Sequence, residues 1–316
     1  MPNVYGRLPR TPDLRDFRAQ PRETAYTGAF VNLEGGMPPV WDQGQLASCV
    51  SHGTCAAMVY ALTHEGAAPI DPSRLFHYYA ARLRAGYDVT QDTGMEIRDG
   101  LASAAKDGVP PQAEWPYVTD AFPVRPPDVA WADARLKEAT VYGAVARGDI
   151  DAVIASGYPV VIGFDVPASF EDQSLAETGV MTVSASDEQS IGGHCVVLIS
   201  TPKDGVAIPG GIKGTLYRRA RNSWGSGWGD RGYFWYPLAA MGRASDFWQV
   251  TTVHAPAPPV PPPTPPPTPP PAPVPDAASA AFAVVLRAED WVDHHHTGAN
   301  ARVSHAAKVW LEAKGL

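Results

Sequence analysis

Two of the three cysteines of the chain lie six residues apart in WDQGQLASCVSHGTC, residues 41–55. Cys49 follows Ser48 where a loop is expected to become a helix. Its sulfur would then lie at a helix N-terminus, where peptide dipoles and free N–H groups stabilise a thiolate. Cys55 lies more than a turn further along and is predicted to be a core residue. Because a buried, inert thiol is the commoner fate of cysteine, Cys49 needs chemical partners before it is assigned a reaction.

A nucleophilic cysteine requires a base, a group that orients the base, and donors for an oxyanion. Gln43, in the loop before the cysteine, offers a side-chain amide donor, and the backbone N–H of Cys49 offers a second. Among nine histidines, His194 is the best candidate base because it follows Ile-Gly-Gly and opens an apolar strand. Cys195 is expected to face the other side of that strand, in the core.

The segment RNSWGSGWGDRGYFWY, residues 221–236, holds an Asn among glycines and tryptophans, which is unusual for a turn. In the order DQGQLASC, GGHCVVLIS and RNSWGSGWGDRGYF, the chain resembles the papain-like (C1) cysteine peptidases over roughly residues 31–250. The separation of its cysteine and histidine agrees with the roughly 130–150 residues usual there. The resemblance implies that Cys49 is the nucleophile, His194 the general base and acid, and Asn222 the residue that orients the imidazole.

The same resemblance implies further roles. Gln43 would be the oxyanion donor, and Trp224 would shield the hydrogen bond between Asn222 and His194. Gly94 and Met95 match the substrate-backbone strand and the wall of a specificity pocket. Gly193 leaves room for a substrate backbone beside the histidine, and both Gly193 and Trp224 are also expected to contact the substrate. The chain departs from the family at Leu46, where a disulfide cysteine is usual, and by a longer gap between His194 and Asn222.

Helix signals fill the first half of the chain, with helices expected within 48–66, 71–86 and 95–108, Ser48 as a possible N-cap of the first, and Asp-Pro-Ser at 71–73 and Gly86 as the ends of the second. Short β-rich runs fill the second half, which predicts an α+β fold. By resemblance this is a two-lobed papain-like fold, with a helical left lobe, an antiparallel β-barrel-like right lobe and a cleft between them. Four segments are predicted: an N-terminal arm over 1–30, a peptidase domain over 31–254, a Pro-rich linker over 255–275 and a small C-terminal helical module over 276–316. The arm lies either across the cleft, restraining activity, or on the back of the domain.

Composition excludes several classes of function. A net charge of −8 and no long basic run argue against nucleic acid. We expect no membrane span and no Sec signal peptide, so the compartment stays open with the cytoplasm as default. Neither a cofactor nor a metal is predicted, since the adjacent histidines at 294–296 rarely converge on one ion. A peptide or protein is the expected substrate, and the linker or the C-terminal module could bind a protein partner.

Two other functions fit parts of the pattern. One is a Cys–His amidase or peptidoglycan peptidase, which would not need the Asn-Ser-Trp-Gly segment. The other is a non-catalytic binding or delivery protein, which would have no need of an intact triad. The sequence therefore predicts a cysteine endopeptidase that acts through Cys49, His194 and Asn222.

Overall fold

The computed structural model of the chain describes residues 3–11, 13, 16, 18–19, 26–134, 139–182 and 189–253. The predicted Pro-rich linker, the C-terminal module and the histidines at 294–296 lie outside these residues. No helix in the described part is long and apolar enough to cross a membrane.

Three longer helices form where the sequence predicts them: α1 (Cys49–His64), α2 (Arg74–Ala85) and α3 (Ile97–Lys106). The Ser73 side chain accepts from the N–H of Phe76 and caps α2, and Gly86 ends that helix in the left-handed conformation. Ser48 precedes α1 but its hydroxyl makes no capping hydrogen bond, so the cap proposed there is wrong. The Ser48 hydroxyl instead pairs with Tyr117 Oη at 2.6 Å.

The remaining helices are short. The α-helices are α4 (Asp128–Ala134), α5 (Ile150–Ala155) and α6 (Gln173–Thr178). Single 3-10 turns are η1 (Glu34–Gly36), η2 (Thr119–Ala121), η4 (Arg147–Asp149), η5 (Ala168–Glu171), η6 (Gly205–Ala207) and η7 (Leu238–Arg243).

Seven antiparallel strands form one sheet in the order β1-β7-β2-β3-β5-β4, with β6 paired to β5. They are β1 (Ala139–Ala144), β2 (Val160–Pro167), β3 (Ser190–Leu198), β4 (Lys203–Asp204), β5 (Leu216–Arg221), β6 (Tyr233–Pro237) and β7 (Ala244–Val253). The sheet is open, because β1 and β4 are at its two ends. The sequence analysis did not anticipate β7, which lies between β1 and β2.

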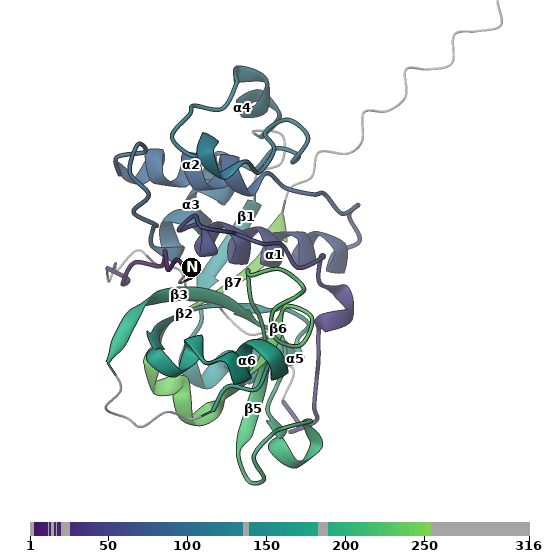
Figure 1. Cartoon of the computed structure of the whole chain (residues 1–316). Helices are drawn as coiled ribbons and strands as arrows, with labels where there is room; N and C mark the ends of the chain where they lie inside the picture. Colours follow the sequence, from purple (N-terminus) through teal and green to yellow (C-terminus); the bar gives the residue numbers. More distant parts are fainter. Residues whose placement is uncertain are drawn as a thin grey trace, which may run out of the picture. The chain divides into compact units, whose positions relative to one another are not determined.

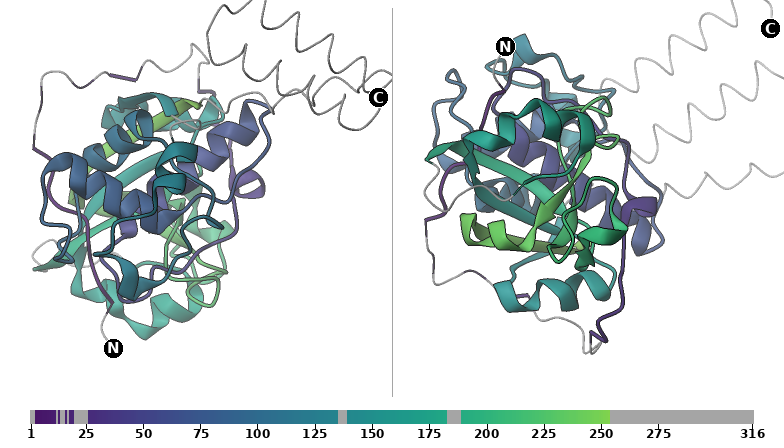
Figure 2. Two further views of the ribbon diagram at one scale, coloured as in Figure 1. Left: turned by 90° about the horizontal axis from the view of Figure 1, so that it is seen from above. Right: turned by 60° about the horizontal axis from the view of Figure 1, so that its bottom comes forward.

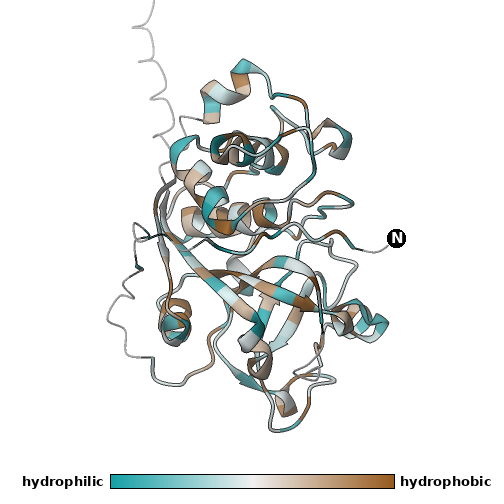
Figure 3. Ribbon diagram, turned by 90° about the vertical axis from the view of Figure 1, so that its left-hand side faces the viewer, coloured by the Kyte–Doolittle hydropathy of each residue, from teal (hydrophilic) through white to brown (hydrophobic). Residues whose placement is uncertain are grey.

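Helix α1 is the element on which both halves of the fold pack. It is apolar on almost every side, and every residue from Cys49 to Leu62 is buried, as expected for a helix inside a core. It packs against α2 and α3 and also against β3 and β7. Figure 1 shows α1–α3 together, with β5, β6 and α6 in the other half, and Figure 2 gives two further views of the same ribbon. Figure 3 shows apolar ribbon on both helices and strands in the middle of the domain. The N-terminal end of α1 therefore faces the sheet.

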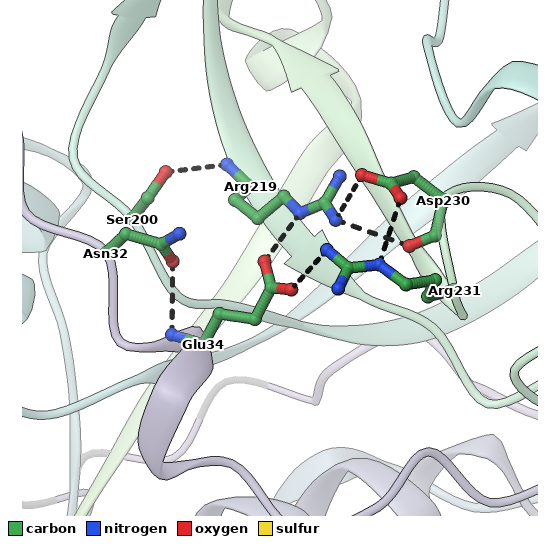
Figure 4. A network of polar contacts seen from close by, with 6 residues as sticks. All are labelled: Asn32, Glu34, Ser200, Arg219, Asp230 and Arg231. Atoms are coloured by element: carbon green, nitrogen blue, oxygen red, sulfur yellow. Dashed lines mark hydrogen bonds and ion pairs between the residues drawn. The ribbon is translucent and has the colours of Figure 1, made fainter.

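A polar network joins η1, near the start of the peptidase domain, to β5 and to the loop before β6 (Figure 4). The Arg219 side chain is 2% exposed and pairs with Glu34 at 3.1 Å and with Asp230 at 2.6 Å. Arg231, 75% exposed, contacts the same two carboxylates. The network fixes η1 against β5 and the loop before β6, the strand that follows the Asn-Ser-Trp-Gly segment.

Candidate active site

Cys49 is the first residue of α1 and is fully buried. The loop before it is held by Asp92, whose carboxylate accepts from the N–H of Ala47 at 3.0 Å and from the Tyr78 hydroxyl. Backbone groups of Gly6, Val50 and Cys195 act on the thiol and lower its pKa. Because Cys195 follows His194 directly, the sulfur lies beside the strand that carries the candidate base.

His194 and Asn222 are joined by the hydrogen bond that the sequence analysis predicts. His194 Nε2 lies 2.8 Å from Asn222 Oδ1, which also accepts from the N–H of Ser223 at 2.8 Å. Since Asn222 Oδ1 can only accept, Nε2 carries the proton. The other ring nitrogen, Nδ1, is buried and has no hydrogen-bond partner within the described residues. This tautomer leaves the lone pair of Nδ1 free to accept a proton.

Aromatic rings enclose this pair. The Trp224 ring stacks on the imidazole of His194 with ring centroids 5.0 Å apart. Phe164 and Phe170 lie about the same imidazole, with centroids 6.0 Å and 6.1 Å away. Such rings exclude water, and a hydrogen bond in a dry environment is electrostatically stronger than one in water.

Gln43 is completely buried and its amide is oriented from both ends. Its Oε1 accepts from the Ser223 hydroxyl at 2.6 Å, which leaves Nε2 as a directed donor. Nε2 donates to the Leu46 carbonyl at 2.9 Å and to the Val4 carbonyl at 3.0 Å. Val4 belongs to the N-terminal arm, so the proposed oxyanion donor already binds a peptide carbonyl.

Residues 3–11 of the arm run along the site in an extended conformation, and Figure 1 shows the N-terminal end between α3 and β3. Met95 N donates to Gly6 O at 2.9 Å, and Leu8 N donates to Met95 O at 3.0 Å. Arg7 N donates to Gly193 O at 2.9 Å. The arm therefore pairs with the strand-like segment at Met95 on one side and with β3 on the other.

Glycines make this close approach of backbones possible. A Cβ on Gly94 would lie 2.0 Å from Gly6 O, and one on Gly193 would lie 2.2 Å from Arg7 O. Gly94 also has a φ of +72°, which favours glycine. All three residues that the resemblance assigned to substrate backbone, Gly94, Met95 and Gly193, thus contact the backbone of the arm.

The arm is anchored at both ends of this stretch. Asn3 donates to Glu171 at 2.7 Å, and the Tyr5 hydroxyl contacts the same carboxylate. The Tyr5 ring lies over His194 with centroids 5.7 Å apart. At the far end, Thr11 is hydrogen-bonded to Glu96 through its N–H at 3.0 Å and its hydroxyl at 2.7 Å.

Burial shifts the pKa values of both Cys49 and His194. Burial raises the pKa of Cys49 to about 11, against the opposing effect of the backbone donors and of the Arg7 charge. Burial also lowers the pKa of His194 to about 4, opposed by the hydrogen bond to Asn222. The expectation of a resting thiolate is therefore wrong for this arm-covered form, in which both groups are neutral at pH 7.

The other cysteines and histidines lie in the core or away from the pair. Cys55 and Cys195 are buried and all three cysteines are free thiols. His52 Nδ1 donates to the Ser48 carbonyl at 3.0 Å, and His77 lies between Ser51 and the Gly100 carbonyl. No cluster of three or more metal-ligating residues occurs in the described part of the chain.

The sequence analysis missed several residues of this site: Asp92, Arg7, Phe170 and Tyr5. Phe170 and Asp92 lie in segments without a chemical motif, and their roles depend on contacts between distant parts of the chain. Arg7 and Tyr5 lie in an arm whose position the sequence left open between the cleft and the back of the domain.

A helical layer packed on an antiparallel sheet, with a buried cysteine at a helix start and a histidine hydrogen-bonded to an asparagine on the sheet, is the arrangement expected of a cysteine peptidase. Residues 32–242 match the family described as papain family cysteine protease. A peptidase C1-like protein of Acanthamoeba polyphaga mimivirus is 33% identical over 232 residues, covering 68% of this chain and 70% of that protein. Vignain of Ricinus communis is 28% identical over 211 residues, covering 63% of this chain and 51% of vignain.

A comparison with solved structures also finds a cysteine protease. Xylellain, a cysteine protease from Xylella fastidiosa, superposes with a TM-score of 0.69 at 32% identity, covering 79% of this chain and 96% of xylellain. The chain belongs to the papain family of cysteine proteases, and a peptide or protein is its class of substrate.

Proposed function

We propose that the chain is a cysteine endopeptidase whose triad is Cys49, His194 and Asn222, with Gln43 as an oxyanion donor, and that its N-terminal arm restrains it. The observation that carries this proposal is the hydrogen bond from Gln43 Nε2 to the Val4 carbonyl at 3.0 Å, beside the buried thiol. The arm places a peptide carbonyl on the donor that a substrate carbonyl would need.

In the proposed reaction the arm leaves, water enters, and the proton moves from Cys49 Sγ to His194 Nδ1. The thiolate attacks the substrate carbonyl carbon, and the oxyanion is held by Gln43 Nε2 and by the N–H of Cys49. His194 then protonates the leaving amine as the C–N bond breaks, which leaves a thioester. Water, activated by the same imidazole, releases the acid and restores the thiol.

The nucleophile is tested by labelling the full chain with a peptidyl epoxide and locating the adduct by mass spectrometry. We expect the adduct on Cys49 and not on Cys55 or Cys195, both of which are buried in the core. Cys49→Ala is expected to fold and to have no peptidase activity. Near-normal turnover by this variant would refute the assignment.

Restraint by the arm is supported by the number of contacts that close the site. Four of these hydrogen bonds are made by the backbone of residues 4–8: Met95 N to Gly6 O, Leu8 N to Met95 O, Arg7 N to Gly193 O, and Gln43 Nε2 to Val4 O. At about 1 kcal/mol each, they would favour the covered form by about 4 kcal/mol, or up to about a thousandfold. The conformational entropy that the arm loses when it docks offsets part of this free energy.

A full-length variant, Gly6→Ala, displaces the arm without altering the cleft. Its Cβ would lie 1.9 Å from the carbonyl oxygen of Ala47 and 2.3 Å from the carbonyl carbon. Because both are backbone atoms, the arm must move. We expect turnover of a fluorogenic peptide to rise at least tenfold, and trypsin to cut after Arg7, which is 3% exposed when docked.

Gly148→Ala is the matched control, because nothing lies within 4 Å of a Cβ at that position. It is expected to keep the wild-type turnover and the wild-type resistance to trypsin. If Gly6→Ala exposes Arg7 to trypsin and turnover does not change, the arm does not restrain the enzyme.

A further inference from the structure

A small interior cavity adjoins Asn222, and neither the triad nor the oxyanion site explains it. Its lining comes from α1 at His52 and Gly53, from β3 at 195–197, and from the chain at 221–223. Every one of these residues is buried. The cavity gives the centre of a water molecule about 10 Å³ of space, which is close to the minimum that one buried water requires.

The cavity lies where strands β3 and β5 separate. The last backbone pair on the way to His194 joins Val197 to Arg221. Asn222, the residue after β5, donates its N–H to the Gly232 carbonyl at 3.0 Å instead of to β3. From there the two chains are joined by side chains, through His194 Nε2 and Asn222 Oδ1. The cavity therefore lies between the end of the backbone pairing and the hydrogen bond that orients the base.

Two polar side-chain atoms of the lining residues are buried and have no hydrogen-bond partner within the described residues: Asn222 Nδ2 and His52 Nε2. The other polar atom of each side chain is engaged. Asn222 Oδ1 accepts from His194 and from the N–H of Ser223. His52 Nδ1 lies 3.0 Å from the Ser48 carbonyl oxygen. Because buried polar groups are nearly always hydrogen-bonded, we expect the two remaining atoms to share a partner in the cavity.

The two unpaired atoms are complementary, since one is a donor and the other an acceptor. The Ser48 carbonyl can only accept, so the proton of His52 is on Nδ1. Burial lowers the pKa of His52 to about 3, against the opposing effect of the Ser48 and Asp42 backbones. The ring is therefore neutral at pH 7 and has one proton, which makes Nε2 an acceptor. Asn222 Nδ2 is a donor, and a water molecule can join the two.

The backbone of Cys195 provides a third partner. Ile199 N donates to Arg219 O at 2.9 Å, so the backbone groups of Ile199 face β5. Because this direction alternates along a strand, the backbone groups of Val197 and Cys195 face the same way. The Cys195 backbone acts on the Cys49 thiol. Its carbonyl is directed to the cavity, because Cys195 lines the cavity at the point where β5 no longer pairs with β3.

We propose that the cavity holds one water, which accepts from Asn222 Nδ2 and donates to His52 Nε2 and to the Cys195 carbonyl. His52 is thereby a positioning residue of the triad. Three hydrogen bonds are the usual number for a buried water. The inference rests on the proposed function, because it gives His52 a role in the reaction of Cys49.

The water fixes which end of the Asn222 amide faces His194. Its two protons are used by acceptors, so its oxygen can only accept, and the amide must present its NH2 group to the water and its oxygen to His194. That oxygen requires the imidazole proton on Nε2, which leaves Nδ1 to receive the proton of Cys49. Without His52 Nε2 the water can donate to Asn222, which favours the flipped amide and the wrong tautomer of the base. The Ser223 N–H still favours the correct amide, so the expected effect is moderate.

The kinetic test uses the full chain with Gly6→Ala as the parent. His52→Phe keeps a ring against Tyr117, which lies 5.0 Å from the imidazole between centroids, but has no acceptor at Nε2. His52→Gln is the conservative variant, since its amide oxygen can take the place of Nε2. Losing the net contribution of one hydrogen bond predicts a kcat about fivefold lower in His52→Phe, per labelled active site. KM is expected to change less than twofold, and His52→Gln to keep kcat within twofold of the parent.

His77→Phe is the matched control. His77 is fully buried in α2, lies 3.0 Å from Ser51 Oγ and 2.8 Å from the Gly100 carbonyl oxygen, and is not part of the cavity lining. The control loses a buried histidine and its hydrogen bonds, as His52→Phe does. We expect it to be destabilised in urea unfolding and to keep kcat within twofold of the parent, per labelled active site.

Two measurements on the full chain are independent of turnover. A crystal structure is expected to show one ordered water within about 3.2 Å of both Asn222 Nδ2 and His52 Nε2. Nitrogen-15 NMR of the histidine-labelled chain at pH 7 is expected to show the proton of His52 on Nδ1. A cavity without that water, or a proton on His52 Nε2, overturns the bridge.

The kinetic outcomes separate this inference from the proposed function. A kcat within twofold of the parent in His52→Phe overturns the positioning role and leaves the peptidase standing. A loss of the same size in His52→Gln or in His77→Phe does so too. Failure of the parent to cleave any peptide, together with failure to label Cys49, overturns the proposed function and the positioning role with it.

Discussion

Replacing Gln43 by alanine separates its role in the transition state from its role in the fold. The variant loses the donor to the oxyanion, which typically costs about 100- to 1000-fold in turnover. It also leaves the Ser223 hydroxyl, 4% exposed, without its acceptor, whereas the Leu46 carbonyl keeps the N–H of Ser48 as a donor at 2.7 Å. The unpaired hydroxyl destabilises the fold by about 1–3 kcal/mol. Turnover must therefore be expressed per folded, labelled active site.

The assay follows two reactions of Cys49 in the full chain that carries Gly6→Ala. Peptide hydrolysis passes through an oxyanion, whereas alkylation by iodoacetamide is a displacement at a saturated carbon and does not. We expect Gln43→Ala to lower hydrolysis 100-fold or more and to change alkylation less than threefold. Ser223→Ala keeps the amide but removes the hydroxyl that orients it, and is expected to cost about tenfold in hydrolysis.

Equal losses in hydrolysis and alkylation in the Gln43→Ala chain would refute this reasoning. That result would mean that Gln43 keeps Cys49 reactive by holding the structure around it. The hydrogen bond to the Val4 carbonyl would then not be evidence that Gln43 binds the oxyanion.

Two further predictions concern the base and the fold. Asn222→Ala removes the acceptor that orients His194 and is expected to lower kcat about 10- to 100-fold at pH 7, measured with saturating peptide; a change below twofold would contradict the orienting role. Arg219→Met removes the buried cation and leaves Glu34 and Asp230 paired with the exposed Arg231; because both carboxylates are partly exposed, we expect a loss of about 2–3 kcal/mol in urea unfolding. Arg231→Met, at a side chain 75% exposed, is expected to change stability by less than about 0.5 kcal/mol, and equal effects would contradict the burial argument.

Helix ends were the features best predicted from the sequence. Cys49 and His194 were proposed because nucleophilic catalysis limits which residue types can do each task, and Asn222 was proposed from the resemblance to the papain-like peptidases. Ser73 and Gly86 were informative because a capping side chain and a left-handed residue act locally. None of these inferences required knowledge of contacts between distant segments.

Strand β7 was missed because polar residues lie among its buried positions. Asp246 and Gln249 are polar and buried, so the strand lacks the apolar alternation by which a sheet edge or core strand is recognised. The pattern fails where the buried carboxylate of Asp246 accepts from Trp248 Nε1.

The ionisation of Cys49 was mispredicted because a local argument was applied to a non-local environment. A helix N-terminus does favour a thiolate, but a segment more than forty positions upstream covers the sulfur. Removing water then dominates over the dipole, and the sequence around Cys49 contains no sign of this.

The most direct test of the account is a pH titration of the Cys49 thiol with and without the arm in place. Thiolate is measured as the absorbance at 240 nm that disappears with Cys49→Ala. Since burial raises the pKa of Cys49 to about 11 in the covered chain, we expect about one thiolate in ten thousand at pH 7, rising only as the pH approaches that value. The full chain with Gly6→Ala is expected to show thiolate already at pH 7. A thiol that stays protonated well above pH 8 in that variant, with Arg7 open to trypsin, would contradict the account.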